Sequence, residues 1–273
     1  MNGVESMFDR TAEDYDRFVS PCRVCQFLVL AHEMNFKGSE KVLDLGSGPG
    51  LLSAHVARLL DDGEVVGVDL SDSMVRLASQ RAHSLKLSNL RFMRGDAMSL
   101  DLPDSAFDAV VSSYLLHWVP DMNRCFTEIR RVLKDDGRLG IMVPSLARYS
   151  ELREAFRRVV SRYCEKDGSR RISEMVGLRV MRREEVLPAL KSAGFEVEKD
   201  FELNLRERLS AAVCLDRVKA ITWERYLEGV PMAERDEVRN ELLREFERNC
   251  GMGLLTTESS IFIIAKKRRG DQV

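Results

Sequence analysis

Three glycines and one aspartate lie at regular spacing in residues 42–50, which read Val-Leu-Asp-Leu-Gly-Ser-Gly-Pro-Gly. Glycines let a backbone turn sharply and approach a ligand closely. Helical periodicity begins near Gly50, and a helix N-terminus presents N–H groups that suit an anion. A dinucleotide fingerprint has the spacing G-x-G-x-x-G, whereas here Gly50 comes one residue early and Leu51 occupies the expected position.

Asp44, two residues before the first glycine, indicates a different ligand. A carboxylate repels a neighbouring pyrophosphate and attracts an ammonium group. A ligand that carries both a carboxylate and an amine, such as an amino-acid moiety, therefore fits this loop better than a pyrophosphate.

Two further acids follow the next two strand-like runs. Asp69 lies near the end of residues 64–70, where an acid accepts hydrogen bonds from ribose hydroxyls. Asp96 follows residues 90–94 and is placed to accept from an exocyclic adenine amine. Either acid alone is more often a solvated loop carboxylate or a helix cap. Together with the glycine loop, they predict a site for a nucleoside joined to an amino acid.

Alternating strands and helices must position these residues. Apolar strand-like runs alternate with helical periodicity, and Ser71 is a suitable N-cap for the second helix. This alternation predicts parallel strands joined by right-handed crossovers, hence a doubly wound α/β sheet. We expect strands at residues 41–45, 64–70, 90–94, 107–112 and 138–143, and helices at 50–60, 71–84 and 122–133.

The second half of the chain adds helical inserts and completes the sheet. Helices are expected at 151–163, 182–193, 209–227 and 232–249, with strands at 195–205 and 258–266. The full prediction is a seven-stranded, mostly parallel sheet with an antiparallel last strand. The inserts are expected to form a lid over the site, or alternatively to thicken the packing on one face. The predicted units are N-terminal helices over the site at 1–39, a ligand-binding core at 40–145, an insert at 146–180, a helix and strand at 181–206, a second insert at 207–252, and a last strand with a basic tail at 253–273.

These motifs resemble those of the class I S-adenosylmethionine-dependent methyltransferases. The first motif is Asp44-x-Gly46-x-Gly48-x-Gly50, the second lies at 68–71 and the third at 95–97. Residues 102–108 and 130–139 are similar to later blocks of the family, so the resemblance covers roughly residues 8–145 and the closing strand. It implies a Rossmann-like fold, S-adenosylmethionine as cofactor, and a set of cofactor-binding residues: Asp44, Gly46, Ser47, Gly48, Gly50, Asp69, Leu70, Met74, Asp96, Ala97 and Ser112.

The resemblance implies a small-molecule acceptor, methylated on carbon or oxygen. Residues 7–16 resemble the opening of both the ubiquinone/menaquinone C-methyltransferases and the malonyl-carrier-protein O-methyltransferases, and residues 115–119 and 149–156 resemble the second group somewhat more. The alternative is therefore esterification of a carboxylate bound to a carrier protein. A rival of another class is a module that has the fold and binds cofactor or partner without chemistry.

Two residues are candidates for catalysis. A general base is needed only if the acceptor keeps its proton at neutral pH. His117 follows the fourth strand at the edge of the cofactor motifs and is one candidate, with Trp118 as a wall of the methyl-donor pocket. The alternative is that His117 caps a short helix and Trp118 lies in the core. Tyr15, on the N-terminal helix, either contacts cofactor or acceptor or is an aromatic of an amphipathic helix.

No metal site is expected. Cys22 and Cys25 form a lone C-x-x-C. A zinc site needs four ligands, and His32 is the only further candidate near this pair. Their spacing also places two small apolar side chains on one helix face, so packing is the preferred interpretation.

Charge and hydropathy limit the partners and the compartment. The 273 residues have a formal net charge of −2, which argues against a nucleic-acid partner. The apolar runs 27–31 and 261–265 are too short to span a bilayer, and no signal peptide is visible. We therefore expect a cytoplasmic protein. Basic residues gather at 153–183, either as a solvated helix face or as a docking surface for an acidic partner.

Overall fold

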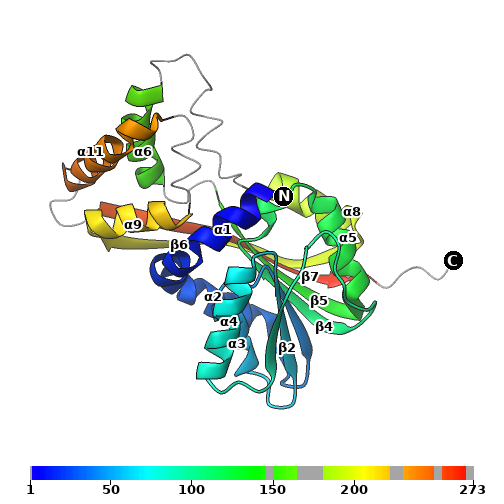
Figure 1. The fold of residues 1–273 in the computed structure, drawn as a ribbon. Helices are drawn as coiled ribbons and strands as arrows, with labels where there is room; N and C mark the ends of the chain where they lie inside the picture. The colour runs from blue at the N-terminus through cyan, green and yellow to red at the C-terminus, as the bar shows by residue number, and fades with distance from the viewer. Residues whose placement is uncertain (1, 146–149, 165–180, 222–229, 249–253, 269–273) are drawn as a thin grey trace.

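The computed structural model describes residues 2–145, 150–164, 181–221, 230–248 and 254–268. In these residues the chain forms one seven-stranded sheet with the order β3-β2-β1-β4-β5-β7-β6 (Figure 1). β7 is antiparallel to both of its neighbours, and the remaining pairs are parallel. The doubly wound fold predicted from the sequence is confirmed. The strands are β1 (Lys41–Leu45), β2 (Glu64–Asp69), β3 (Leu90–Arg94), β4 (Phe107–Ser113), β5 (Leu133–Pro144), β6 (Phe195–Leu209) and β7 (Leu254–Lys267).

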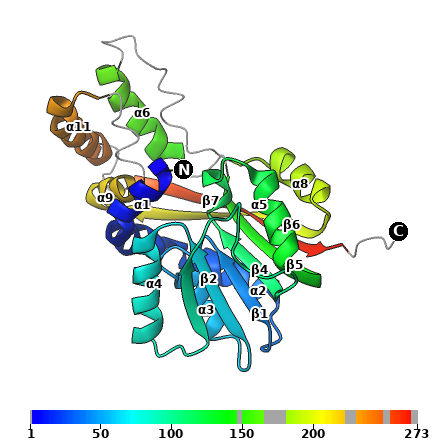
Figure 2. The same cartoon turned by 45° about the vertical axis from the view of Figure 1, so that its right-hand side comes forward.

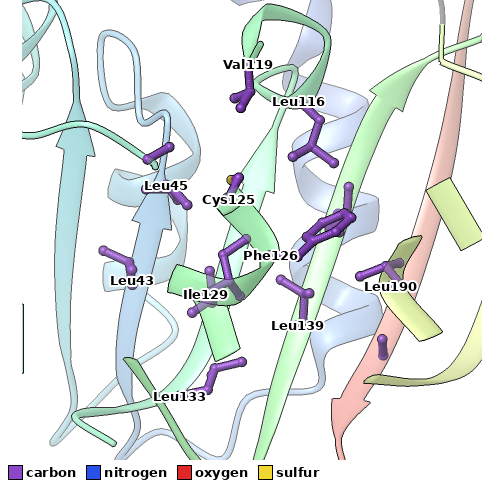
Figure 3. Close-up of a cluster of buried hydrophobic side chains, with 14 of the residues drawn as sticks. Leu43, Leu45, Leu116, Val119, Cys125, Phe126, Ile129, Leu133, Leu139 and Leu190 are labelled. Atoms are coloured by element: carbon purple, nitrogen blue, oxygen red, sulfur yellow. The ribbon is translucent and has the colours of Figure 1, made fainter. Parts of the chain in front are cut away.

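The central strands bury mostly apolar side chains, because helices cover both faces of the sheet. On one face α5 (Met122–Val132) and α8 (Arg183–Ser192) bury Phe126 and Leu190 against strand residues such as Leu43 and Leu139 (Figure 3). On the other face α2 (Val24–Met34) and α3 (Leu51–Ala57) cover the sheet. Between these two layers β1 pairs in parallel with β2 and β4, which places the glycine loop that follows β1 at the edge of the sheet.

The remaining helix of the core begins as predicted. α4 (Asp72–Ser84) has Ser71 as its N-cap, with Ser71 Oγ accepting from the backbone N–H of Met74 at 3.2 Å. Because Ser71 caps α4, the helix begins directly after β2, at the edge of the sheet where Asp69 and Asp96 lie.

The N-terminal segment lies across this edge. It consists of α1 (Asn2–Asp14), a π-helical stretch η1 (Tyr15–Val19) and a 3₁₀ turn η2 (Ser20–Arg23) that leads into α2. α1 contacts α4 on one side and α9 (Ala211–Ile221) on the other (Figures 1 and 2). The segment therefore bridges the core and the helical inserts.

The last two strands are longer than the sequence suggested. β6 and β7 remain paired as far as Leu209 and Leu254, beyond the predicted strand limits. The extension projects from the sheet and carries α9, α6 (Ser150–Cys164) and α11 (Arg235–Arg248) (Figure 2). These helices have a small core of their own, to which Val159, Leu215 and Phe246 contribute. The predicted helix at 209–227 is described as far as 221, and the rest of it lies outside the described residues.

β5 is also longer than predicted. It begins at Leu133, directly after α5, rather than near residue 138.

Among the described residues, none of the helices has both the length and the apolar character needed to cross a bilayer.

Candidate active site

A cavity opens at the carboxyl ends of β1, β2 and β4, as expected for ligand sites of open α/β sheets. Its empty space, together with the open solvent at its mouth, is about 1060 Å³. The N-terminal segment contributes to its wall, whereas none of the described lining residues comes from α6, α9 or α11. The residues are Val4, Phe8, Tyr15, Leu45, Gly46, Gly48, Val68, Asp69, Leu70, Met74, Gly95, Asp96, Ala97, Met98, Ser113, Tyr114, Leu115, Trp118, Val119 and Pro120.

The three glycines of the loop have different surroundings. All three have positive φ, at 74° for Gly46, 52° for Gly48 and 80° for Gly50. A Cβ on Gly46 would meet Leu115 at 2.8 Å, and one on Gly50 would meet Phe92 at 2.7 Å. A Cβ on Gly48 would meet no atom of the described residues within 4 Å, and Gly48 lines the open cavity. Gly48 therefore leaves room beside the backbone for a ligand.

Asp69 anchors this loop to the end of β2. Its Oδ2 accepts from the backbone N–H of Gly48 at 2.8 Å, and its Oδ1 accepts from the N–H of Ser71 at 3.0 Å. Burial raises the pKa of Asp69, and these hydrogen bonds oppose the rise. The carboxylate lines the cavity and retains lone pairs that can accept from ligand hydroxyls.

Asp44 lies behind the loop and is fully buried. Its Oδ2 accepts from Ser53 Oγ at 2.5 Å, and its Oδ1 has no hydrogen-bond partner among the described residues. Burial raises the pKa of Asp44 to about 7, and the charge of Asp69 contributes to the rise. Ser47 Oγ is likewise buried without a partner in the described chain. Asp44 Oδ1 and Ser47 Oγ can therefore each form a further hydrogen bond.

The third predicted motif forms a mostly apolar part of the wall. Asp96 Oδ1 accepts from the backbone N–H of Met98 at 2.9 Å, which folds the loop after β3 toward the cavity. The apolar residues Leu70, Met74 and Ala97 also line it. These residues place apolar surface beside the carboxylate of Asp96 in the same wall.

Aromatic residues form another part of the wall. The ring of Phe8 lies 5.9 Å from that of Tyr15 and 5.2 Å from that of Trp118, edge to face in both cases. Asp16 in η1 pairs with Arg81 at 2.8 Å, and Arg81 also donates to the carbonyl of Pro49. Arg81 thus joins the N-terminal segment, which carries Phe8 and Tyr15, to the glycine loop.

Tyr114 is a cavity residue that the sequence prediction missed. It follows β4 with a positive φ of 54°, an uncommon conformation for a bulky residue. Its hydroxyl donates to Glu258 at 2.8 Å and lies 2.5 Å from Ser260 Oγ. The guanidinium of Arg23 lies 3.8 Å above its ring and donates to the hydroxyl of Tyr15 at 2.5 Å. Position directly after the fourth strand was the only sequence signal for this residue.

Several predicted residues lie outside the cavity wall. Ser112 Oγ donates to the carbonyl of Leu45 at 2.9 Å, and its neighbour Ser113 lines the cavity instead. His117 is buried in a 3₁₀ turn, with its ring 5.1 Å from that of Trp118. Asp44, Ser47 and Gly50 are likewise not among the described lining residues. Predicted residues within the wall are Tyr15, Gly46, Gly48, Asp69, Leu70, Met74, Asp96, Ala97 and Trp118.

Comparisons with known proteins agree with this geometry. Residues 43–141 match the family described as "Methyltransferase domain". A malonyl-[acyl-carrier protein] O-methyltransferase of Geobacter sulfurreducens is 30% identical over 202 residues, which cover 73% of this chain and 72% of that protein. The chain belongs to the class I S-adenosylmethionine-dependent methyltransferase family.

Other members of the family are similar over different spans. The sterol 24-C-methyltransferase erg6 of Aspergillus fumigatus is 33% identical over 202 residues, covering 73% of this chain and 48% of that protein. The chain spans about half the length of several curated relatives that it matches. The crystal structure of YcgJ from Bacillus subtilis has the same fold, with a TM-score of 0.59 at 21% identity, covering 89% of this chain and 98% of that chain.

The residues present fit the cofactor of this methyltransferase family. The open space at Gly48 suits close approach of an amino-acid moiety. Oδ1 of Asp44, which has no hydrogen-bond partner in the described part of the chain, is a buried acceptor of the kind that an ammonium group satisfies. Asp69 and Asp96 line one continuous cavity at the ends of neighbouring strands.

The cysteines have ordinary surroundings. Cys22 Sγ donates to the carbonyl of Val19 at 2.7 Å, and Cys25 is exposed. Among the described residues, no group of three or more His, Cys, Asp or Glu side chains is placed to hold a metal ion.

Proposed function

We propose that this protein transfers a methyl group from S-adenosylmethionine to a small organic acceptor. The observation that carries the proposal is the single cavity that joins Gly48, Asp69 and Asp96 to the aromatic residues of the N-terminal segment. Fold alone does not assign a reaction, so the proposal depends on this site and on family membership together.

Each cofactor group has a proposed partner. The backbone at Gly46 and Gly48 receives the methionine part, and Asp44 favours its ammonium from behind the loop. Asp69 accepts from the ribose hydroxyls, and Asp96 with Ala97 receives the adenine. The bound cofactor supplies an electrophilic methyl group on a sulfonium. The protein supplies alignment and exclusion of water, which are the main requirements of an in-line displacement.

The acceptor is proposed to be apolar around its reacting atom. Among the described lining residues, Asp69 and Asp96 are the charged side chains, and no lysine, arginine or histidine contributes to the wall. The aromatic residues Phe8, Tyr15, Tyr114 and Trp118 provide flat apolar surfaces instead. If the acceptor retains a proton, we assign the contact with it to Tyr15 rather than to His117, because Tyr15 lines the cavity.

A second candidate is esterification of a carboxylate held by a carrier protein. It is supported by the relative from Geobacter sulfurreducens, of which this chain covers 72%. The basic helix α6 offers less free charge to an acidic partner than its sequence suggests. Arg158 pairs with Glu245 at 2.9 Å, and Arg162 pairs with Glu241. The structural observations therefore favour the free small molecule.

The decisive experiment is transfer of label from methyl-labelled S-adenosylmethionine. The protein is incubated with a fractionated metabolite extract, and separately with malonyl-carrier protein, using Asp69→Asn as the matched control. Label in a small molecule that depends on Asp69 supports the main proposal, and label in the carrier-protein sample supports the second candidate. Binding of the cofactor with no label transfer in either sample would indicate a non-catalytic module.

A further inference from the structure

Asp9 joins the helix that covers the cavity, α1, to the start of α4. Asp9 of α1 accepts from Ser71 Oγ at 2.5 Å and from the backbone N–H of Ser73 at 3.1 Å. The backbone N–H of the same Ser71 donates to Asp69 at 3.0 Å. Ser71 therefore links a carboxylate on the cover to the carboxylate assigned to the ribose.

The position of Asp9 favours a charged carboxylate. Ser71 is the N-cap of α4, and a helix N-terminus combines free N–H groups with the positive end of the helix dipole. The hydrogen bond from Ser71 holds the pKa of Asp9 below its ordinary value, and Arg94 acts in the same direction. Asp9 thus contributes a charge-assisted contact between α1 and α4.

The same part of α1 faces the cavity. Val4 and Phe8 line it, and Phe8 is adjacent to Asp9 in sequence. Glu5, one turn before Asp9, pairs with Arg94 at 2.5 Å, but the Arg94 side chain is 51% exposed. An exposed ion pair contributes little, so the contact made by Asp9 is the stronger one.

We propose that Asp9 is a positioning residue that holds α1 over the bound cofactor, and that cofactor binding at Asp69 and closure of α1 strengthen each other. This inference rests on the proposed function, because it takes Asp69 as the ribose ligand. A ribose that orders Asp69 also orders Ser71, whose hydroxyl then remains directed at Asp9. Coupling of this kind is reciprocal, so loss of the Asp9 contact must weaken cofactor binding.

The test combines hydrogen exchange with binding kinetics, using S-adenosylhomocysteine as the probe. Wild type is compared with Asp9→Asn, and Glu5→Gln is the matched control on the same helix. We expect the probe to protect the amides of residues 2–14 in wild type and in Glu5→Gln. In Asp9→Asn this protection is lost, while protection of the glycine loop remains. We expect S-adenosylhomocysteine to bind Asp9→Asn with a dissociation constant about tenfold higher than in wild type, mainly because it dissociates faster.

The possible results separate the two proposals. If wild type does not bind the probe, the proposed function and this inference both fail. If it binds without protecting residues 2–14, or if Asp9→Asn keeps the wild-type dissociation rate and protection, the inference alone is overturned. Asp9→Ser retains an acceptor without the charge and replaces Asp9→Asn if that variant does not fold.

Discussion

Asp69 Oδ2 accepts a hydrogen bond from the backbone N–H of Gly48 at 2.8 Å. The acid at the end of β2 thus holds the glycine loop after β1, although 21 residues separate the two positions in sequence. One carboxylate has two tasks in the proposed mechanism, since it shapes the loop and accepts from the ribose. Its removal must affect both.

Replacement of Asp69 tests this dual role. Asp69→Ala removes the acceptor of the Gly48 N–H and the proposed acceptor of the ribose hydroxyls. Hydrogen bonds to a charged group contribute roughly 1.5–3 kcal/mol each, so affinity for S-adenosylhomocysteine should fall at least tenfold. Calorimetric titration measures the loss. An unchanged dissociation constant would refute the assignment.

Gly48 and Gly38 form a matched pair for testing the cradle. Both have positive φ, and a Cβ on Gly38 would lie 3.8 Å from its nearest neighbours, near Asp61. Alanine at either position costs about 1–2 kcal/mol of stability because of the left-handed backbone. Only Gly48→Ala should also block the cofactor, and Gly48→Val should do so more completely. Equal affinities of Gly48→Ala and Gly38→Ala for S-adenosylhomocysteine would exclude the cradle.

The positions of the cofactor motifs were predictable because local patterns determine them. Apolar runs define the strands, and Ser71 caps α4 as its residue type suggests. Since parallel strands end at the same edge of a sheet, Asp69 and Asp96 had to lie near the glycine loop. What local patterns could not show is that Gly48 alone of the three loop glycines faces open space.

The role of Tyr114 could not be read from the sequence. Its position depends on Glu258, which is 144 residues away, and on Arg23 from the N-terminal segment. The extension of β6 to Leu209 has a similar cause, because it requires a partner in β7 across a long insert. Contacts between distant segments leave no periodic signal in either segment alone.

Asp44 should make stability depend on pH. Its pKa rises from 3.8 to about 7 on folding because the carboxyl is buried. Between about pH 4 and pH 7 the folded chain therefore holds a proton that the unfolded chain has released, and the free energy of unfolding falls as pH rises. Asp44→Asn cannot titrate. Denaturation across this range should show wild type losing stability relative to Asp44→Asn as pH increases, and parallel curves would exclude the shift.

We expect replacement of His117 to lower thermal stability and replacement of Tyr15 to slow turnover. His117 is buried beside Trp118 and lies outside the described wall, so His117→Ala should lower the melting temperature and leave affinity for S-adenosylhomocysteine little changed. Tyr15→Phe keeps the ring in the wall and removes the hydroxyl that accepts from Arg23. It should slow turnover of an acceptor that must lose a proton. The reverse pattern, with His117→Ala slowing turnover at full stability, would return the base role to His117.

The central claim is that the cavity at the end of β1 and β2 is a cofactor site. Calorimetric titration of the wild-type chain with S-adenosylhomocysteine, repeated with Asp69→Ala and Gly48→Val, tests it most directly. The proposed mechanism predicts saturable binding at one site per chain, weakened in the first variant and abolished in the second. Absence of binding by the wild type at high micromolar concentration, or equal binding by all three proteins, would contradict it.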